Sequence, residues 1–284
     1  MWYFFKKNKF LVITLVFIIL IIGGIIVAEN PAIMSFFITL SNRNLRPGSF
    51  THPILIPDTV SNLHPPPNLD RSLRNISLVR QHDTFLCVAA SIYMIENYYF
   101  GENYFAEVPY DYRDPTSWVY LREIFDQIAV YDNEGRAMGG GWALAAQYME
   151  NRGLYAGVVY FHDFKEILMY METNKIPAIL NIQSIGSYLF SHAVVFTGYN
   201  PEEDIIYILD PGDPNNTFIS GERFMEITRN TIIIVADRLN IERAFFCPID
   251  NRRMAIDESI LDAISGLFCP GCGTFSYIPG SAPL

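Results

Sequence analysis

The hydrophobic pattern of the chain begins with one long uncharged run. Phe10–Ala28 contains nineteen residues without a charge, which is enough to cross a bilayer as a helix. Lys6, Lys7 and Lys9 precede it, as expected for a cytoplasmic flank. A cleaved signal peptide is the alternative, but the run is longer than the usual apolar region of such peptides, and no A-x-A cleavage site follows it. The sequence therefore predicts a membrane anchor in residues 1–30, with the remainder on the extracytoplasmic side.

Residues 31–74 are rich in proline and asparagine and include the stretch HPILIPDTVSNLHPPPNLD. Three consecutive prolines exclude a helix at that point, because proline fixes φ and lacks a backbone N–H. We expect an extended spacer that holds a folded domain away from the membrane.

Shorter apolar segments, separated by turn residues, predict helices first and strands afterwards. The expected helices are residues 87–100, 142–152 and 164–174. The expected strands are residues 154–161, 176–182, 192–199, 204–209 and 231–237. Helices followed by a mainly antiparallel sheet are typical of an α+β domain, which we place at residues 75–240 with a cysteine-containing tail at 241–284.

Polar residues and glycines mark the expected helix ends. Asp83 or Thr84 can cap the first helix, and Gly101 can end it. Asp163 begins a capping box ahead of the third helix. These ends put Cys87 in the first turn of its helix.

The charge of the chain disfavours two classes of partner. Of 20 basic and 30 acidic side chains, three lysines precede the apolar run, so the rest of the chain carries 17 − 30 = −13 formal charges. A surface that acidic argues against nucleic acid or anionic lipid as the main partner. Nothing in the pattern indicates an oligomeric state.

Cys87 and the glutamine six positions before it are candidates for catalysis. A lone cysteine on an apolar helix is more often a buried core residue. At a helix start, however, unpaired N–H groups and the positive end of the helix dipole favour a thiolate, which is the nucleophile of thiol hydrolases. The amide of Gln81 could then stabilise an oxyanion together with the backbone N–H of Cys87.

A histidine and an aspartate could complete such a site. If the hairpin of the strands HAVVFTGY and IIYIL is symmetric about Pro201, His192 and Asp210 lie opposite each other on one face. A carboxylate there could fix the imidazole tautomer and stabilise the imidazolium. The inference depends on the register, because a slip of one residue would separate the two side chains. Taken singly, a histidine at the start of a buried strand is usually structural, and Asp-Pro after a strand is ordinary turn chemistry.

Two segments together resemble one family. RQHDTFLCVAASIYMIENYY is similar to the Q-x-D-x-x-x-C-G-x-A-type opening of the bacteriocin-processing (double-glycine) peptidases, a papain-like family, and SHAVVFTGYNPEEDIIYILDP resembles their H-x-V-V-x-x-G-Y … D-P segment. The resemblance spans roughly residues 78 to 237. It implies that Cys87 is the nucleophile, His192 the base, Asp210 the orienting residue and Gln81 the oxyanion donor.

The sequence also departs from that family. Val88 follows the cysteine where the family has glycine, which could narrow the cleft and favours a catalytically silent peptide-binding domain as an alternative. An acyl transferase could use the same triad. No nucleotide-binding or multi-span transporter segment accompanies the domain, so the resemblance implies a stand-alone, membrane-anchored relative.

We therefore expect a papain-like α+β cysteine peptidase, preceded by one transmembrane helix, that acts on a peptide or protein substrate. No H-E-x-x-H pattern or phosphate-binding glycine loop is present, so no cofactor is expected.

The remaining cysteines lie in FCPID and FCPGCG near the C-terminus. Cys247, Cys269 and Cys272 could hold a zinc ion, since C-P-G-C is a common half of a metal knuckle, with Asp250 as a poor fourth ligand. A disulfide from Cys247 to one of the other two is preferred over zinc, because a domain outside the cytoplasm meets an oxidising environment.

Overall fold

The structure is a computed structural model that describes residues 46–47, 72–183 and 191–278 of the 284-residue chain. The predicted anchor in residues 1–30 and all of the predicted spacer except residues 46–47 and 72–74 lie outside this part. Within it, no helix combines the length and the apolar composition that a membrane span requires.

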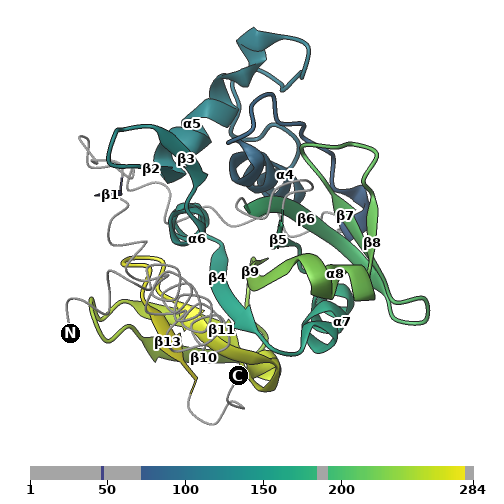
Figure 1. Cartoon of the computed structure of the whole chain (residues 1–284), viewed down its shortest axis with the longest axis vertical. Helices are drawn as coiled ribbons and strands as arrows, with labels where there is room; N and C mark the ends of the chain where they lie inside the picture. The colour runs from purple at the N-terminus through teal and green to yellow at the C-terminus, as the bar shows by residue number, and fades with distance from the viewer. Residues whose placement is uncertain (1–45, 48–71, 184–190, 279–284) are drawn as a thin grey trace, which may run out of the picture. The chain divides into compact units, whose positions relative to one another are not determined.

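An antiparallel sheet forms the centre of the fold (Figure 1). Eight strands of the described residues belong to it: β4 (Tyr155–Phe161), β5 (Ala178–Gln183), β6 (Ser191–Asn200), β7 (Ile205–Leu209), β8 (Phe218–Ser220), β9 (Thr228–Ala236), β12 (Ile264–Phe268) and β13 (Phe275–Tyr277). Their order is β13-β12-β4-β9-β5-β6-β7-β8, and every neighbouring pair is antiparallel. The five strands predicted from the sequence and the α+β class are thereby confirmed.

Helices pack on this sheet and around it. They are α4 (Cys87–Phe100), α5 (Val119–Ile128), α6 (Trp142–Asn151), α7 (Phe164–Asn174) and α8 (Gly221–Ile227), with 3₁₀ turns at Leu73–Asn75, Pro115–Trp118 and Glu258–Ala263. The three predicted helices correspond to α4, α6 and α7. The Asp163 side chain accepts a hydrogen bond from the backbone N–H of Glu166, as the capping box predicts.

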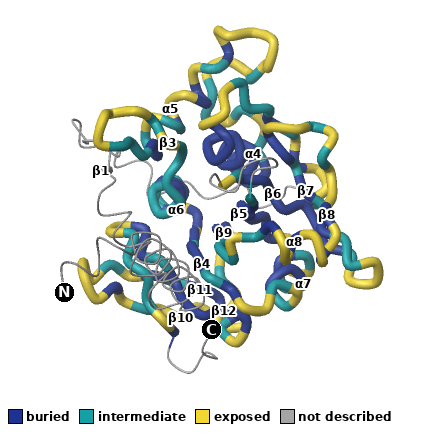
Figure 2. The backbone as a smooth tube through the Cα atoms, viewed as in Figure 1, coloured by how far each residue is buried: buried dark blue, intermediate teal, exposed yellow. Residues whose placement is uncertain are grey.

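Burial is extensive where α4 meets the sheet. Every residue of α4 except Asn97 is buried, and seven consecutive residues of β6, 193–199, are buried as well (Figure 2). Successive side chains of a strand point to opposite faces, so β6 is covered on both. It contacts both α4 and α7. This packing fixes the two elements that carry Cys87 and His192.

A second, small sheet lies next to α4. It consists of β1 (Arg46–Pro47), β2 (Ala129–Tyr131) and β3 (Ala137–Gly140). Its first strand falls within the segment that the sequence assigns to the spacer, where Arg46 pairs with Tyr131.

The segment from residue 241 extends the main sheet, which differs from the separate tail that the sequence predicts. It begins with the hairpin β10 (Glu242–Phe246) and β11 (Arg253–Asp257) and then contributes β12, which pairs with β4. Ile264 and Leu267 of β12 are buried in the core. β12 is only five residues long and includes Ser265 and Gly266, so it carries little strand signal in the sequence.

Candidate active site

Cys87 is the first residue of α4, and only 7% of its surface is exposed. The residue before the helix is Leu86, which offers no side-chain cap, so the predicted cap by Asp83 or Thr84 is wrong. Asp83 instead accepts hydrogen bonds from the backbone N–H of Phe85 and the hydroxyl of Thr84, which closes a turn ahead of the helix. No side-chain cap therefore lies between the Cys87 sulfur and the N-terminal end of α4.

His192 and Asp210 lie in contact, but the predicted register of their strands is wrong. Val195 pairs with Leu209. Nearer the turn, a β-bulge between Phe196 and Gly198 changes the register by one residue. Direct opposition therefore does not bring the two residues together. The ladder between β6 and β7 ends at Leu209, and the chain turns back after it, which carries the Asp210 carboxylate to the ring: His192 Nε2 lies 2.6 Å from Asp210 Oδ1.

The turn after Asp210 orients its carboxylate. Oδ1 also accepts hydrogen bonds from the backbone N–H groups of Gly212 (2.8 Å) and Asp213 (3.1 Å), and Oδ2 accepts one from the Asn216 amide (3.0 Å). Burial by itself would raise the pKa of Asp210, but the hydrogen bond from His192 and the other donors hold it below its usual value. Asn216 was not identified from the sequence, where it lies in the turn sequence GDPNN with no distinguishing signal.

His192 is held between the carboxylate and the cysteine. Its backbone pairs with Ile182 of β5, which fixes the position of the residue in the sheet. Because Nε2 is bound to Asp210, Nδ1 is the nitrogen left for the hydrogen bond with Cys87. Burial acts to lower the pKa of His192, but the hydrogen bonds to Asp210 and Cys87 outweigh it and raise the pKa to about 10. The imidazole is therefore protonated at neutral pH.

Gln81 lies next to the turn that orients the carboxylate. Its backbone N–H donates to the carbonyl of Pro211 (2.9 Å), so the segment before α4 is tied to the segment after β7. Its side-chain Oε1 is buried and has no hydrogen-bond partner in the described residues. The neighbouring His82 takes no part in this arrangement, because its ring stacks on Trp118 with 3.7 Å between the centroids.

Val88 packs into the core beside the small sheet. It is 4% exposed, and its side chain occupies the space beside Gly140 of β3. A Cβ at Gly140 would lie 2.8 Å from the Cβ of Val88, so a larger residue at 140 could not accompany valine at 88. Valine thus stands at the position after the cysteine, and Gly140 on the neighbouring strand leaves the space that its side chain needs.

A buried cysteine at a helix start, bound to an imidazole that a buried carboxylate orients, is the arrangement of a papain-like cysteine peptidase. The chain belongs to the Peptidase_C39 like family, whose model matches residues 73–224, more than half of its length. It is a cysteine peptidase of that family, as the sequence predicts.

Three solved structures illustrate the likeness. A double glycine motif protease from an AMS/PCAT transporter, in complex with the leader peptide, is 21% identical over 61% of this chain and 98% of its own, with a TM-score of 0.39. The peptidase domain of Streptococcus ComA, a bi-functional ABC transporter, is 18% identical over 57% and 99% (TM-score 0.40). A C39-like peptidase from Bacillus anthracis is 15% identical over 60% and 99% (TM-score 0.39). No curated protein matches the chain.

Proposed function

We propose that the domain hydrolyses peptide bonds with Cys87 as nucleophile, His192 as general base and acid, and Asp210 as the residue that orients the imidazole. The observation that carries this proposal is that His192 interacts with both Asp210 and Cys87. One ring nitrogen is bound to Asp210 at 2.6 Å, and the ring also hydrogen-bonds Cys87 at the start of α4.

The proposed reaction has two steps. The Cys87 thiolate attacks the carbonyl carbon of the scissile bond, and the imidazolium of His192 donates its proton to the leaving amine, which gives a thioester. The now neutral imidazole takes a proton from water, whose oxygen attacks the thioester; the carbon–sulfur bond breaks, which releases the acid product and restores the thiolate and the imidazolium. The Gln81 amide and the backbone N–H of Cys87 are the proposed donors to the oxyanion in both steps.

The substrate that we propose is a peptide or protein, because the family is a peptidase family. The burial of Val88 in the core supports this proposal over that of a catalytically silent domain. An N-terminal membrane anchor and an extracytoplasmic position of the domain stay predictions from the sequence.

Alkylation of the cysteines tests this function. Iodoacetamide should modify Cys87 faster in the wild type than in a His192→Ala variant, because the imidazolium favours the reactive thiolate. Peptide mass spectrometry distinguishes Cys87 from the other three cysteines, which serve as internal controls. Equal rates at Cys87 in the two proteins would indicate a domain without a catalytic pair.

Replacing Gln81 by alanine should lower kcat by roughly ten- to a thousand-fold, the range for one oxyanion donor. The loss should fall on kcat more than on KM, because the donor acts on charge that develops in the transition state. Gln81→Glu is the matched variant: it keeps the size but cannot donate as a carboxylate, so it should be as slow as alanine. Steady-state kinetics on a peptide substrate measure both, and an active Gln81→Glu protein would exclude this role.

A further inference from the structure

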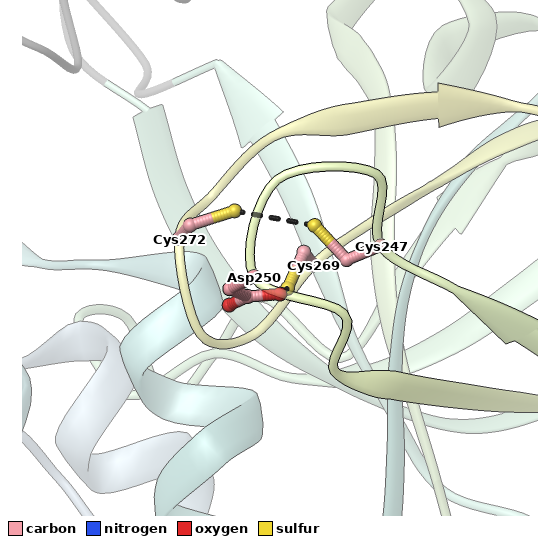
Figure 3. A group of neighbouring side chains, drawn as sticks. All are labelled: Cys247, Asp250, Cys269 and Cys272. Carbon is pink, nitrogen blue, oxygen red and sulfur yellow. Dashed lines mark hydrogen bonds between the residues drawn. The ribbon is translucent and has the colours of Figure 1, made fainter.

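Two turns near the C-terminus bring three cysteines and a carboxylate together (Figure 3). The turn between β10 and β11 carries Cys247 and Asp250, and the turn between β12 and β13 carries Cys269 and Cys272. One ligand atom from each residue lies within 4.8 Å of all the others. All three cysteines are free thiols, so the disulfide preferred from the sequence is not present.

The two turns have the same construction. In each, the backbone N–H of the first cysteine donates to the carbonyl five residues on, and its carbonyl accepts from the N–H four residues on, where φ is positive. The bonds are Cys247 N to Arg252 O (2.9 Å) and Asn251 N to Cys247 O (3.0 Å) in one turn, and Cys269 N to Thr274 O (2.9 Å) and Gly273 N to Cys269 O (2.8 Å) in the other. Asp250 therefore occupies the position in the first turn that Cys272 occupies in the second.

Both turns also donate to sulfur. The backbone N–H of Ile249 points at Cys247 Sγ (3.4 Å), and that of Gly271 points at Cys269 Sγ (3.3 Å). These two cysteines are 2% and 0% exposed. A buried thiol gains little from such a donor, whereas a thiolate that binds a metal is stabilised by it.

The residues around the cluster leave space for Asp250 and position it. A Cβ at Gly271 would overlap Asp250 Oδ2, so the approach of the carboxylate requires glycine there. The backbone N–H of Arg252 donates to Asp250 Oδ1 (3.0 Å), and its guanidinium supplies positive charge near a group of anionic ligands.

We propose that Cys247, Asp250, Cys269 and Cys272 bind one zinc ion. Two sulfurs about 2.3 Å from one ion at the tetrahedral angle lie about 3.8 Å apart. The Cys247 and Cys272 sulfurs are 3.4 Å apart, and the Cys269 sulfur is 3.5 Å from both Asp250 oxygens, so small shifts would complete a tetrahedral site. A disulfide between Cys247 and Cys272, with its sulfurs about 2.05 Å apart, would leave Cys269 and the Gly271 N–H that points at its sulfur without a function. Thiolates in tetrahedral geometry select zinc over magnesium or calcium.

The site is structural. Four protein ligands leave no position for water or substrate. The ion would join the β10–β11 hairpin to the turn between β12 and β13, at one end of the main sheet. Three strands, β4, β9 and β5, separate β12 from β6, which carries His192. Removing the metal should therefore lower stability without changing the chemistry of the triad directly.

Metal analysis of the full chain tests the proposal. Protein purified with zinc and without chelator should contain about one zinc per chain, and the double variant Cys269→Ser/Cys272→Ser should contain none. The Cys87→Ser variant, which removes a cysteine outside the cluster, should keep its zinc. Cobalt(II) in place of zinc should show thiolate-to-metal charge-transfer absorption, and a chelator should lower the Tm of the wild type but not of the double variant.

Substitution of Asp250 keeps the test informative if the double variant does not fold. Asp250→Cys should retain zinc longer than the wild type against a competing chelator, and Asp250→Ala should lose it sooner, because a thiolate is the better zinc ligand. A Cys247–Cys272 disulfide in unreduced, zinc-free protein would overturn the proposal. So would reduced protein that takes up no zinc, or a double variant that retains it.

Discussion

Replacing Cys87 by alanine should abolish turnover and leave the fold intact. We expect kcat to fall by on the order of 10⁴-fold or more, since no other group can form the acyl intermediate. The substitution removes only the sulfur: the hydrogen bond that Ser91 donates goes to the backbone carbonyl of Cys87, at 2.8 Å, and it survives. Alanine is also a better helix former than cysteine, so α4 should not lose stability at this position through propensity.

Peptide hydrolysis by the purified variant, together with its Tm, measures both parts of this expectation. Cys87→Ser is a useful companion, because its hydroxyl keeps the shape of the side chain but is a poor nucleophile without a strong base. Wild-type activity in the alanine variant would end the thiol-peptidase mechanism. Loss of activity together with a large drop in Tm would instead point to a role of the sulfur in the core.

Replacing His192 by alanine should lower kcat by roughly 10²- to 10⁴-fold, the contribution of one general acid–base group. Asp210→Ala should cost less, because Asp210 acts through the orientation and charge of the imidazole. His162→Ala is the matched control: that ring hydrogen-bonds Ser265, on a strand remote from β6, and its loss should leave kcat unchanged. Equal activity of the His192→Ala and His162→Ala proteins would remove His192 from the mechanism.

The pH dependence tests how the two residues act together. The pKa of His192 is raised to about 10, so the imidazolium that protonates the leaving group should be lost only near that pH. In Asp210→Asn, His192 loses its bond to a carboxylate, the largest of the causes that raise its pKa, while burial still lowers that pKa. The alkaline limb of kcat/KM should therefore move to lower pH. An unchanged limb would mean that another group titrates there.

The same shifts give the sign of the stability change. A raised pKa of His192 stabilises the folded state below its ordinary value of 6.5, and this contribution is lost as the pH rises through about 10. The lowered pKa of Asp210 stabilises the folded state at pH values above 3.8, the ordinary pKa of the group, and that contribution is lost as the pH falls below it. The Tm deficit of Asp210→Asn should therefore be largest between these ordinary values and shrink toward pH 10.

Local sequence signals were sufficient for most of the elements around the site. The helix from Cys87 to Phe100, the capping box at Asp163 and the strands β4 to β7 all follow from apolar spacing and turn residues, because these depend on contacts within a few positions of the chain. The segment 102–140 shows the limit of such signals. Its helix α5 buries Leu121, Ile124 and Ile128 at helical spacing, but aromatic and acidic residues on both sides obscure the period.

What the sequence determined by itself is the chemical content of the molecule: a cysteine at a helix start, a histidine and an aspartate on consecutive strands, and paired C-P turns. The tertiary structure decided how these residues meet. A bulge and a turn, not strand opposition, bring Asp210 to His192, because a register depends on packing against both neighbouring strands. Gly140 makes room for Val88 from a strand about fifty residues away. The two C-P turns become one four-ligand cluster only because β12 pairs with β4 and the hairpin β10–β11 lies against β4 as well, a long-range arrangement that no local pattern encodes.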